Sequence, residues 1–141
     1  MKKALITFAI LAGAALPVVH AGSLRIVNQR PVPYVGEIVA TNNPSAPSIA
    51  TAIYAQVTVP ANTTVFYPDP TNMVSPYGPG APPSATGVFI GLKGGLTGIP
   101  LDGTVGVAGT YLGYPLFRNN LPAFLITWSQ PTPTDAVVTI L

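Results

Sequence analysis

Cysteine is absent from the 141-residue chain, and the one histidine lies within the first 21 residues. Disulfide-stabilised scaffolds are therefore excluded. Residues 22–141 cannot form a Ser–His–Asp or Cys–His catalytic group, and they lack the usual ligands of zinc, copper and haem. We expect a protein that is not an enzyme of these classes and that uses no metal or cofactor.

Charged residues are also scarce, at 7% of the chain, against about 25% in an average soluble protein. Residues 22–141 contain four basic and four acidic residues and have a formal net charge of zero: Arg25, Arg30, Lys93 and Arg118 against Glu37, Asp69, Asp102 and Asp135. Without a positive field there is little to attract phosphates, so nucleic-acid binding is disfavoured. The same neutrality removes the repulsion that keeps soluble proteins apart, which favours self-assembly.

The N-terminal segment has the organisation of a secretory signal peptide of bacterial type. Lys2 and Lys3 precede an apolar stretch over residues 4–16, and Pro17 is followed by compact residues up to Ala21. The stretch is shorter than the roughly 20 residues that span a bilayer. We expect cleavage after Ala21 and an extracellular or periplasmic location.

After residue 21 the hydrophobic pattern has a period of two, which is typical of β-strands. The sixteen prolines of residues 22–141 are incompatible with long helices. We predict one all-β domain over residues 22–141, an antiparallel β-sandwich of jelly-roll or Ig-like type. Its strands are too short for an outer-membrane barrel. About eight short strands are expected, at residues 24–28, 34–40, 48–59, 63–67, 87–92, 104–112, 123–129 and 136–141.

Alternation within the predicted strands assigns residues to the core. In residues 48–59 the odd-numbered positions, from Ile49 to Val59, share one face. In residues 123–129, Trp128 shares a face with Phe124 and Ile126, so it is expected in the core rather than on a sugar-binding surface.

Two segments interrupt this simple pattern. Residues 68–84 contain six prolines and two glycines and are interpreted as a strap between two sheets, with a recognition loop presenting Tyr77 and Met73 as the alternative. Residues 91–113 are rich in glycine and are predicted to form a hairpin that turns at residues 93–95, where glycines allow bulges or close sheet contact. The alternative is a segment that contacts a membrane or docks a partner.

Catalysis by carboxylates would require two of the four acidic residues to face each other across a groove. No spacing singles out a pair, and no Asp-x-Asp cluster indicates calcium. Tyr111 and Tyr114 are the best candidates for exposed, ligand-binding aromatic residues, with Tyr77 in the proline-rich loop as a third.

These observations favour a secreted, non-enzymatic protein that acts through its surfaces, as a self-assembling structural or adhesive subunit of an extracellular filament or matrix. Residues 24–28 and 136–141 are predicted to be the edge strands through which copies pair. One alternative is a binding module for carbohydrate or another small ligand, using Tyr111, Tyr114 or residues 68–84. Another is a membrane-active protein that inserts residues 91–113.

Overall fold

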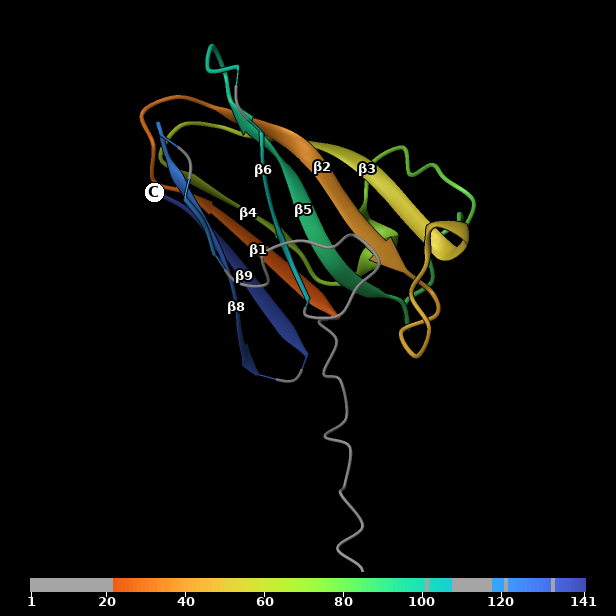
Figure 1. The fold of residues 1–141 in the computed structure, drawn as a ribbon. Coiled ribbons are helices and arrows are strands. Elements are labelled where there is room, and N and C mark those ends of the chain that lie inside the picture. The colour runs from red at the N-terminus through yellow and green to blue at the C-terminus, as the bar shows by residue number, and fades with distance from the viewer. Residues whose placement is uncertain (1–21, 101, 108–117, 121, 133) are drawn as a thin grey trace, which may run out of the picture.

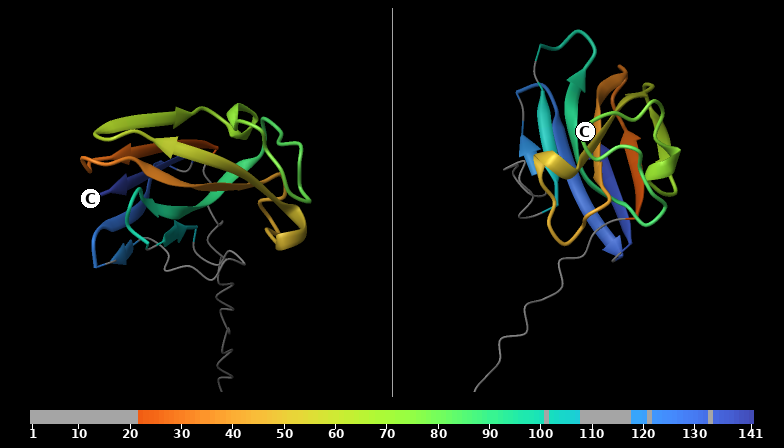
Figure 2. Two further views of the ribbon diagram at one scale, coloured as in Figure 1. Left: turned by 90° about the horizontal axis from the view of Figure 1, so that it is seen from above. Right: turned by 90° about the vertical axis from the view of Figure 1, so that its right-hand side faces the viewer.

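The computed structural model describes residues 22–100, 102–107, 118–120, 122–132 and 134–141. These residues form nine strands and two single turns of 3-10 helix, η1 (Ile49–Thr51) and η2 (Pro70–Asn72). The strands form two sheets that pack face to face (Figures 1 and 2). The predicted all-β sandwich is confirmed.

The first sheet has five strands and contains both the first and the last strand of the chain. Its spatial order is β4 (Thr63–Tyr67), β1 (Ser23–Asn28), β9 (Asp135–Ile140), β8 (Leu125–Thr132) and β7 (Arg118–Asn120). The left view of Figure 2 shows β4 at the outer margin of the molecule. β4 and β7 are therefore the edges of this sheet.

The second sheet has four strands, all antiparallel to their neighbours. Its order is β3 (Ala52–Val59), β2 (Tyr34–Thr41), β5 (Val88–Leu96) and β6 (Gly103–Gly106). β3 and β4 are consecutive in the chain but belong to different sheets, so the turn between them links the two layers at one side of the sandwich.

The core lies between the sheets and is built from the residues that alternation assigned to it. Phe124, Ile126 and Trp128 are buried, as predicted, and so are Ile53 and the other odd-numbered residues of β3. Ile49 and Thr51 are the exceptions: both lie in the 3-10 turn before β3, where Ile49 is 68% exposed and Thr51 is only partly buried. The strand thus begins at Ala52, because the chain turns once before it joins the sheet.

The pairing of β1 with β9 departs from the antiparallel prediction. The two strands run parallel, with Ser23 beside Asp135 and Asn28 beside Ile140. β1 also pairs with β4, in antiparallel fashion. The first strand of the chain is therefore enclosed by neighbours on both sides.

Asn28 joins three segments at the end of β1. It is 1% exposed, and its Nδ2 donates to the carbonyls of Val32, Val59 and Pro60 at 2.9, 3.1 and 3.1 Å. Its Oδ1 accepts from the backbone N–H of Arg30 at 3.0 Å. A buried amide satisfied in this way fixes the turn after β1 against the turn between β3 and β4.

The predicted turn at residues 93–95 is wrong. β5 continues without interruption from Val88 to Leu96, and Gly94 lies beside Gly36 of β2. A Cβ on Gly94 would lie 2.3 Å from the carbonyl oxygen of Val35, and one on Gly36 would lie 2.4 Å from that of Lys93. The glycines serve the close sheet contact that the sequence also suggested, because no side chain fits between these two strands.

Replacing Gly36 by alanine is expected to destabilise the fold. The new methyl group would also collide with the ring of the buried Tyr34, whose Cε1 lies 2.7 Å from the Cβ position. Overpacking of this kind costs about 1–3 kcal/mol, which urea denaturation measures directly. Gly22→Ala is the matched control, because its Cβ meets only the carbonyl oxygen of Thr134 at 3.7 Å. Equal denaturation midpoints for the two variants would contradict this account.

Candidate functional site

Among the described residues, the outer edge of β4 is a stretch of backbone that pairs with no neighbouring strand. β4 pairs with β1 on one side only. Among the backbone hydrogen bonds that the described residues form outside the strands, none involves residues 63–67. Thr64 and Phe66 also expose their side chains, and Phe66 is 53% exposed.

The hydrogen bonds of β1 show which backbone groups of β4 are unpaired. Ser23 N–H donates to the carbonyl of Thr134, and Gln29 N–H donates to that of Ile140, each at 2.9 Å. The odd-numbered residues of β1 therefore bond to β9, and the even-numbered ones face β4. Their partners in β4 are residues 63, 65 and 67. The N–H and C=O groups of Thr64 and Phe66 consequently point away from the sheet.

The outer face of the five-stranded sheet carries a groove next to this edge. The groove has a volume of about 440 Å³ and is lined by Ser23, Arg25, Phe66, Pro131, Asp135, Ala136 and Val137. The guanidinium carbon of Arg25 lies 5.6 Å from the centre of the Phe66 ring, a cation–π arrangement. An aromatic ring, a cation and a carboxylate are thus close together beside the β4 edge.

Asp135 is held in place by two hydroxyl groups. Ser23 Oγ donates to its Oδ1 and Thr132 Oγ1 to its Oδ2, both at 2.5 Å. The hydrogen bond from Ser23, then that from Thr132, and the charge of Arg25 hold the pKa of Asp135 below its usual range. Because Ser23 begins β1 and Asp135 begins β9, the carboxylate joins the two strands at their start.

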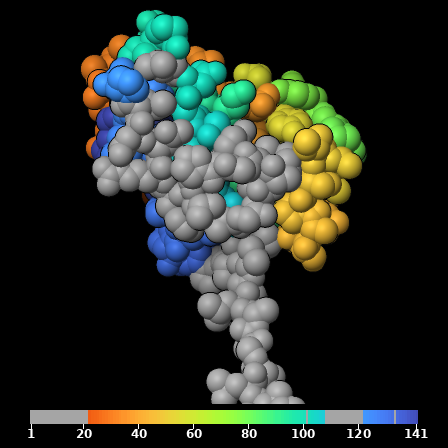
Figure 3. All heavy atoms as spheres, viewed as in Figure 1, coloured from red at the N-terminus to blue at the C-terminus, as the bar shows by residue number. Residues whose placement is uncertain are grey.

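The edge of the other sheet is partly covered by the proline-rich segment. Tyr77 and Tyr54 of β3 exchange two backbone hydrogen bonds of 2.8 and 2.9 Å, and Gly80 N–H donates to the carbonyl of Ala52 at 3.0 Å. In Figure 3 this segment (green) lies along one side of the molecule, beside the residues that lead into β3 (yellow). Because residues 68–84 run from β4 of one sheet to β5 of the other, they form the predicted strap.

Tyr77, one of the three predicted binding residues, lies within this strap. Its ring lies 5.7 Å from that of Tyr54, and its hydroxyl donates to Glu37 Oε1. This hydrogen bond raises the pKa of the Tyr77 hydroxyl above its usual value. Tyr77 remains 46% exposed. The other two predicted residues, Tyr111 and Tyr114, lie outside the described residues.

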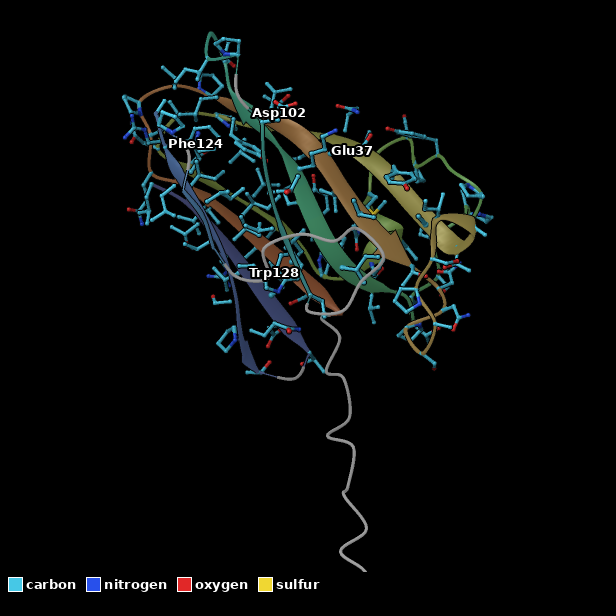
Figure 4. The ribbon with its side chains drawn as sticks, viewed as in Figure 1. Glu37, Asp102, Phe124 and Trp128 are labelled. Carbon is cyan, nitrogen blue, oxygen red and sulfur yellow. The ribbon has the colours of Figure 1, made fainter. Side chains whose placement is uncertain are left out.

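A shallow polar hollow of about 240 Å³ lies on the outer face of the four-stranded sheet. It is lined by Val35, Gly36, Glu37, Gln56, Lys93, Gly94 and Asp102. Two of the four acidic residues, Glu37 and Asp102, thus border one hollow, a grouping that sequence spacing did not indicate (Figure 4). Glu37 and Lys93 are direct neighbours on adjacent strands. Groups of three or more His, Cys, Asp or Glu residues suited to a metal ion do not occur in the part of the chain that the structure describes.

Two predicted edge strands are not edges. Residues 24–28 belong to β1 and residues 136–141 overlap β9, and both strands lie inside the five-stranded sheet. Their backbone groups are used by each other and by β4 and β8. Alternation assigns the faces of a strand but not its neighbours, so β4 was missed as the edge.

Comparison with family models, with curated proteins and with solved structures finds no match for this chain. The helical residues that the structure describes include no span long and apolar enough to cross a membrane.

Replacing Asp135 by asparagine is expected to destabilise the protein in a pH-dependent manner. A lowered pKa means that the ionised carboxylate stabilises the fold above the unfolded-state pKa of about 3.9, and that this contribution is lost as the pH falls through the lower folded-state value. The variant should therefore unfold at lower urea concentration than the parent at pH 7, and the difference should shrink in acid. Asp102→Asn is the control. A difference for Asp135→Asn that stays constant down to about pH 2 would contradict this role.

Proposed function

We propose that this protein is a non-enzymatic structural subunit that acts through its surfaces and associates with copies of itself, in an extracellular filament, matrix or adhesive layer. The observation that carries this proposal is the open edge of β4, where Thr64 and Phe66 direct unpaired backbone groups away from the sheet. Such an edge accepts a further strand through main-chain hydrogen bonds.

The composition of β4 supports association through this edge. Soluble proteins protect edge strands with lysine, proline, bulges or covering loops. β4 reads Thr-Thr-Val-Phe-Tyr and has neither proline nor charge. In the four-stranded sheet, the strap covers the edge strand β3 by bonding to the backbone of Ala52 and Tyr54. The rest of β3 exposes the polar side chains of Gln56 and Thr58. Of these two neighbouring edges, only β4 combines unpaired backbone with an exposed aromatic ring.

Export is part of the same proposal. Cleavage after Ala21 would leave Gly22 as the only residue before β1, which begins at Ser23. The proposed secretory segment would then end where the folded sheet begins, so that its removal would leave all the described strands in place. We propose an extracellular or periplasmic location on this basis.

A second candidate function is the binding of carbohydrate or another small ligand in the groove beside β4. The half-exposed Phe66 ring, with Arg25 and Asp135 close by, combines an apolar surface with polar groups in the way that sugar-binding surfaces require. Glycan binding that is lost in Phe66→Ala but retained in Thr64→Lys would favour this function over self-association.

The principal prediction is concentration-dependent self-association of the exported protein. Sedimentation velocity and light scattering should detect species larger than the monomer, and electron microscopy should reveal any polymer. Thr64→Lys should weaken association, because it adds a charge to an uncharged edge without removing a bond to β1. Thr97→Lys adds the same charge at an exposed residue between β5 and β6 and serves as the control. A parent protein that stays monomeric at high concentration contradicts the proposal.

A further inference from the structure

We infer that two copies of this chain join edge to edge through β4, in antiparallel register about a two-fold axis that passes beside Val65. The inference rests on the proposed self-association and specifies the partner, the register and the residues in contact. The joined strands would form a continuous ten-stranded sheet from the two five-stranded sheets.

The register follows from the number of backbone groups that need partners. Thr64 and Phe66 each present one N–H and one C=O, and in an antiparallel pair two directly opposed residues exchange both of their hydrogen bonds. When Thr64 of one copy opposes Phe66 of the other, the two-fold axis repeats the pair. All the outward groups of β4 in both copies are then satisfied, and Val65 opposes its own counterpart.

Other symmetric registers satisfy fewer groups. Centring the axis on Phe66 places Thr64 opposite Pro68, which has no N–H to donate. Centring it on Thr64 places Phe66 opposite Asn62, whose N–H already donates to the carbonyl of Arg30 at 3.0 Å. The residues at the two ends of β4 thus select the Val65-centred register.

The side chains of Phe66 and Thr64 can also pack together in the Val65-centred register. Phe66 is 53% exposed and has Arg25 on the β1 side. In the Val65-centred pair, Thr64 of the second copy lies on its other side, and the two Phe66 rings are diagonal neighbours on one face, within reach of each other. The exposed ring is then covered on both sides. The scarcity of charge helps, because β4 itself has no charged residue to bury.

The absence of cysteine from the chain allows a direct test with single cysteine variants. In the Val65-centred register the two Val65 Cα atoms are about 4.5 Å apart, as in a non-hydrogen-bonded pair, and this suits a disulfide. Val65→Cys should therefore form a covalent dimer under mild oxidation. Thr63→Cys is the matched control on the same strand, since its two copies would be roughly 13 Å apart along the strands and should remain unlinked.

A second variant tests the backbone hydrogen bonds of the β4 edge without introducing a disulfide. Thr64→Pro removes only an outward N–H, so the bonds between β4 and β1 are kept, whereas Thr64→Val keeps the N–H and serves as its control. Loss of two hydrogen bonds per dimer should raise the dissociation constant roughly tenfold to a hundredfold. Circular dichroism should show that both variants fold.

The outcomes separate this inference from the proposed function. Cross-linking of Val65→Cys with weakened association of Thr64→Pro supports the two-fold β4 pair. Association of the parent protein without cross-linking of Val65→Cys, or with equal affinity in Thr64→Pro and Thr64→Val, overturns the pair and leaves self-association through another surface. A strictly monomeric parent protein overturns both.

Discussion

The parallel pairing of β1 with β9 determines which strands lie inside the five-stranded sheet and which strand forms its edge next to β1. It places the first and last strands of the described fold side by side in the interior of one sheet, with Ser23 and Asp135 joined at the start of the pair. Because β9 occupies one side of β1, a further strand can pair only with the other side, and β4 pairs there. β4 is an edge of this sheet because no other strand in the described part of the chain pairs with its outer side.

The strap explains why the two edges on this side of the sandwich differ. The chain leaves β4, turns at η2 and passes along the start of β3 before it enters β5. Its covering bonds therefore fall on β3 and not on β4. The prolines that keep the strap from forming a regular strand also keep it from pairing along the whole of β3, so its protection ends near Tyr54.

The alternation of apolar and polar residues along each strand correctly predicted which side of the strand faces the core. Trp128 and the odd-numbered residues of β3 were assigned to the core correctly because alternation alone decides their burial. Strand order depends on pairing between distant residues, so β1 and β9 were mistaken for edges. Gly94 was assigned to a turn because glycine serves turns and close strand contacts equally well in sequence. The hollow that brings Glu37 and Asp102 together was likewise invisible, since these residues are far apart in the chain.

A chain with so few charges has limited means of choosing a partner. Long-range attraction is weak when cations and anions balance, and the polar hollow beside Glu37 is shallow and open to water. Backbone hydrogen bonds at a strand edge require no charge, but they would accept many strands. Specificity must then come from register, and β4 restricts its register by a proline at one end and an occupied N–H at the other. In the proposed self-association, the second copy of β4 would supply a partner strand with the same spacing.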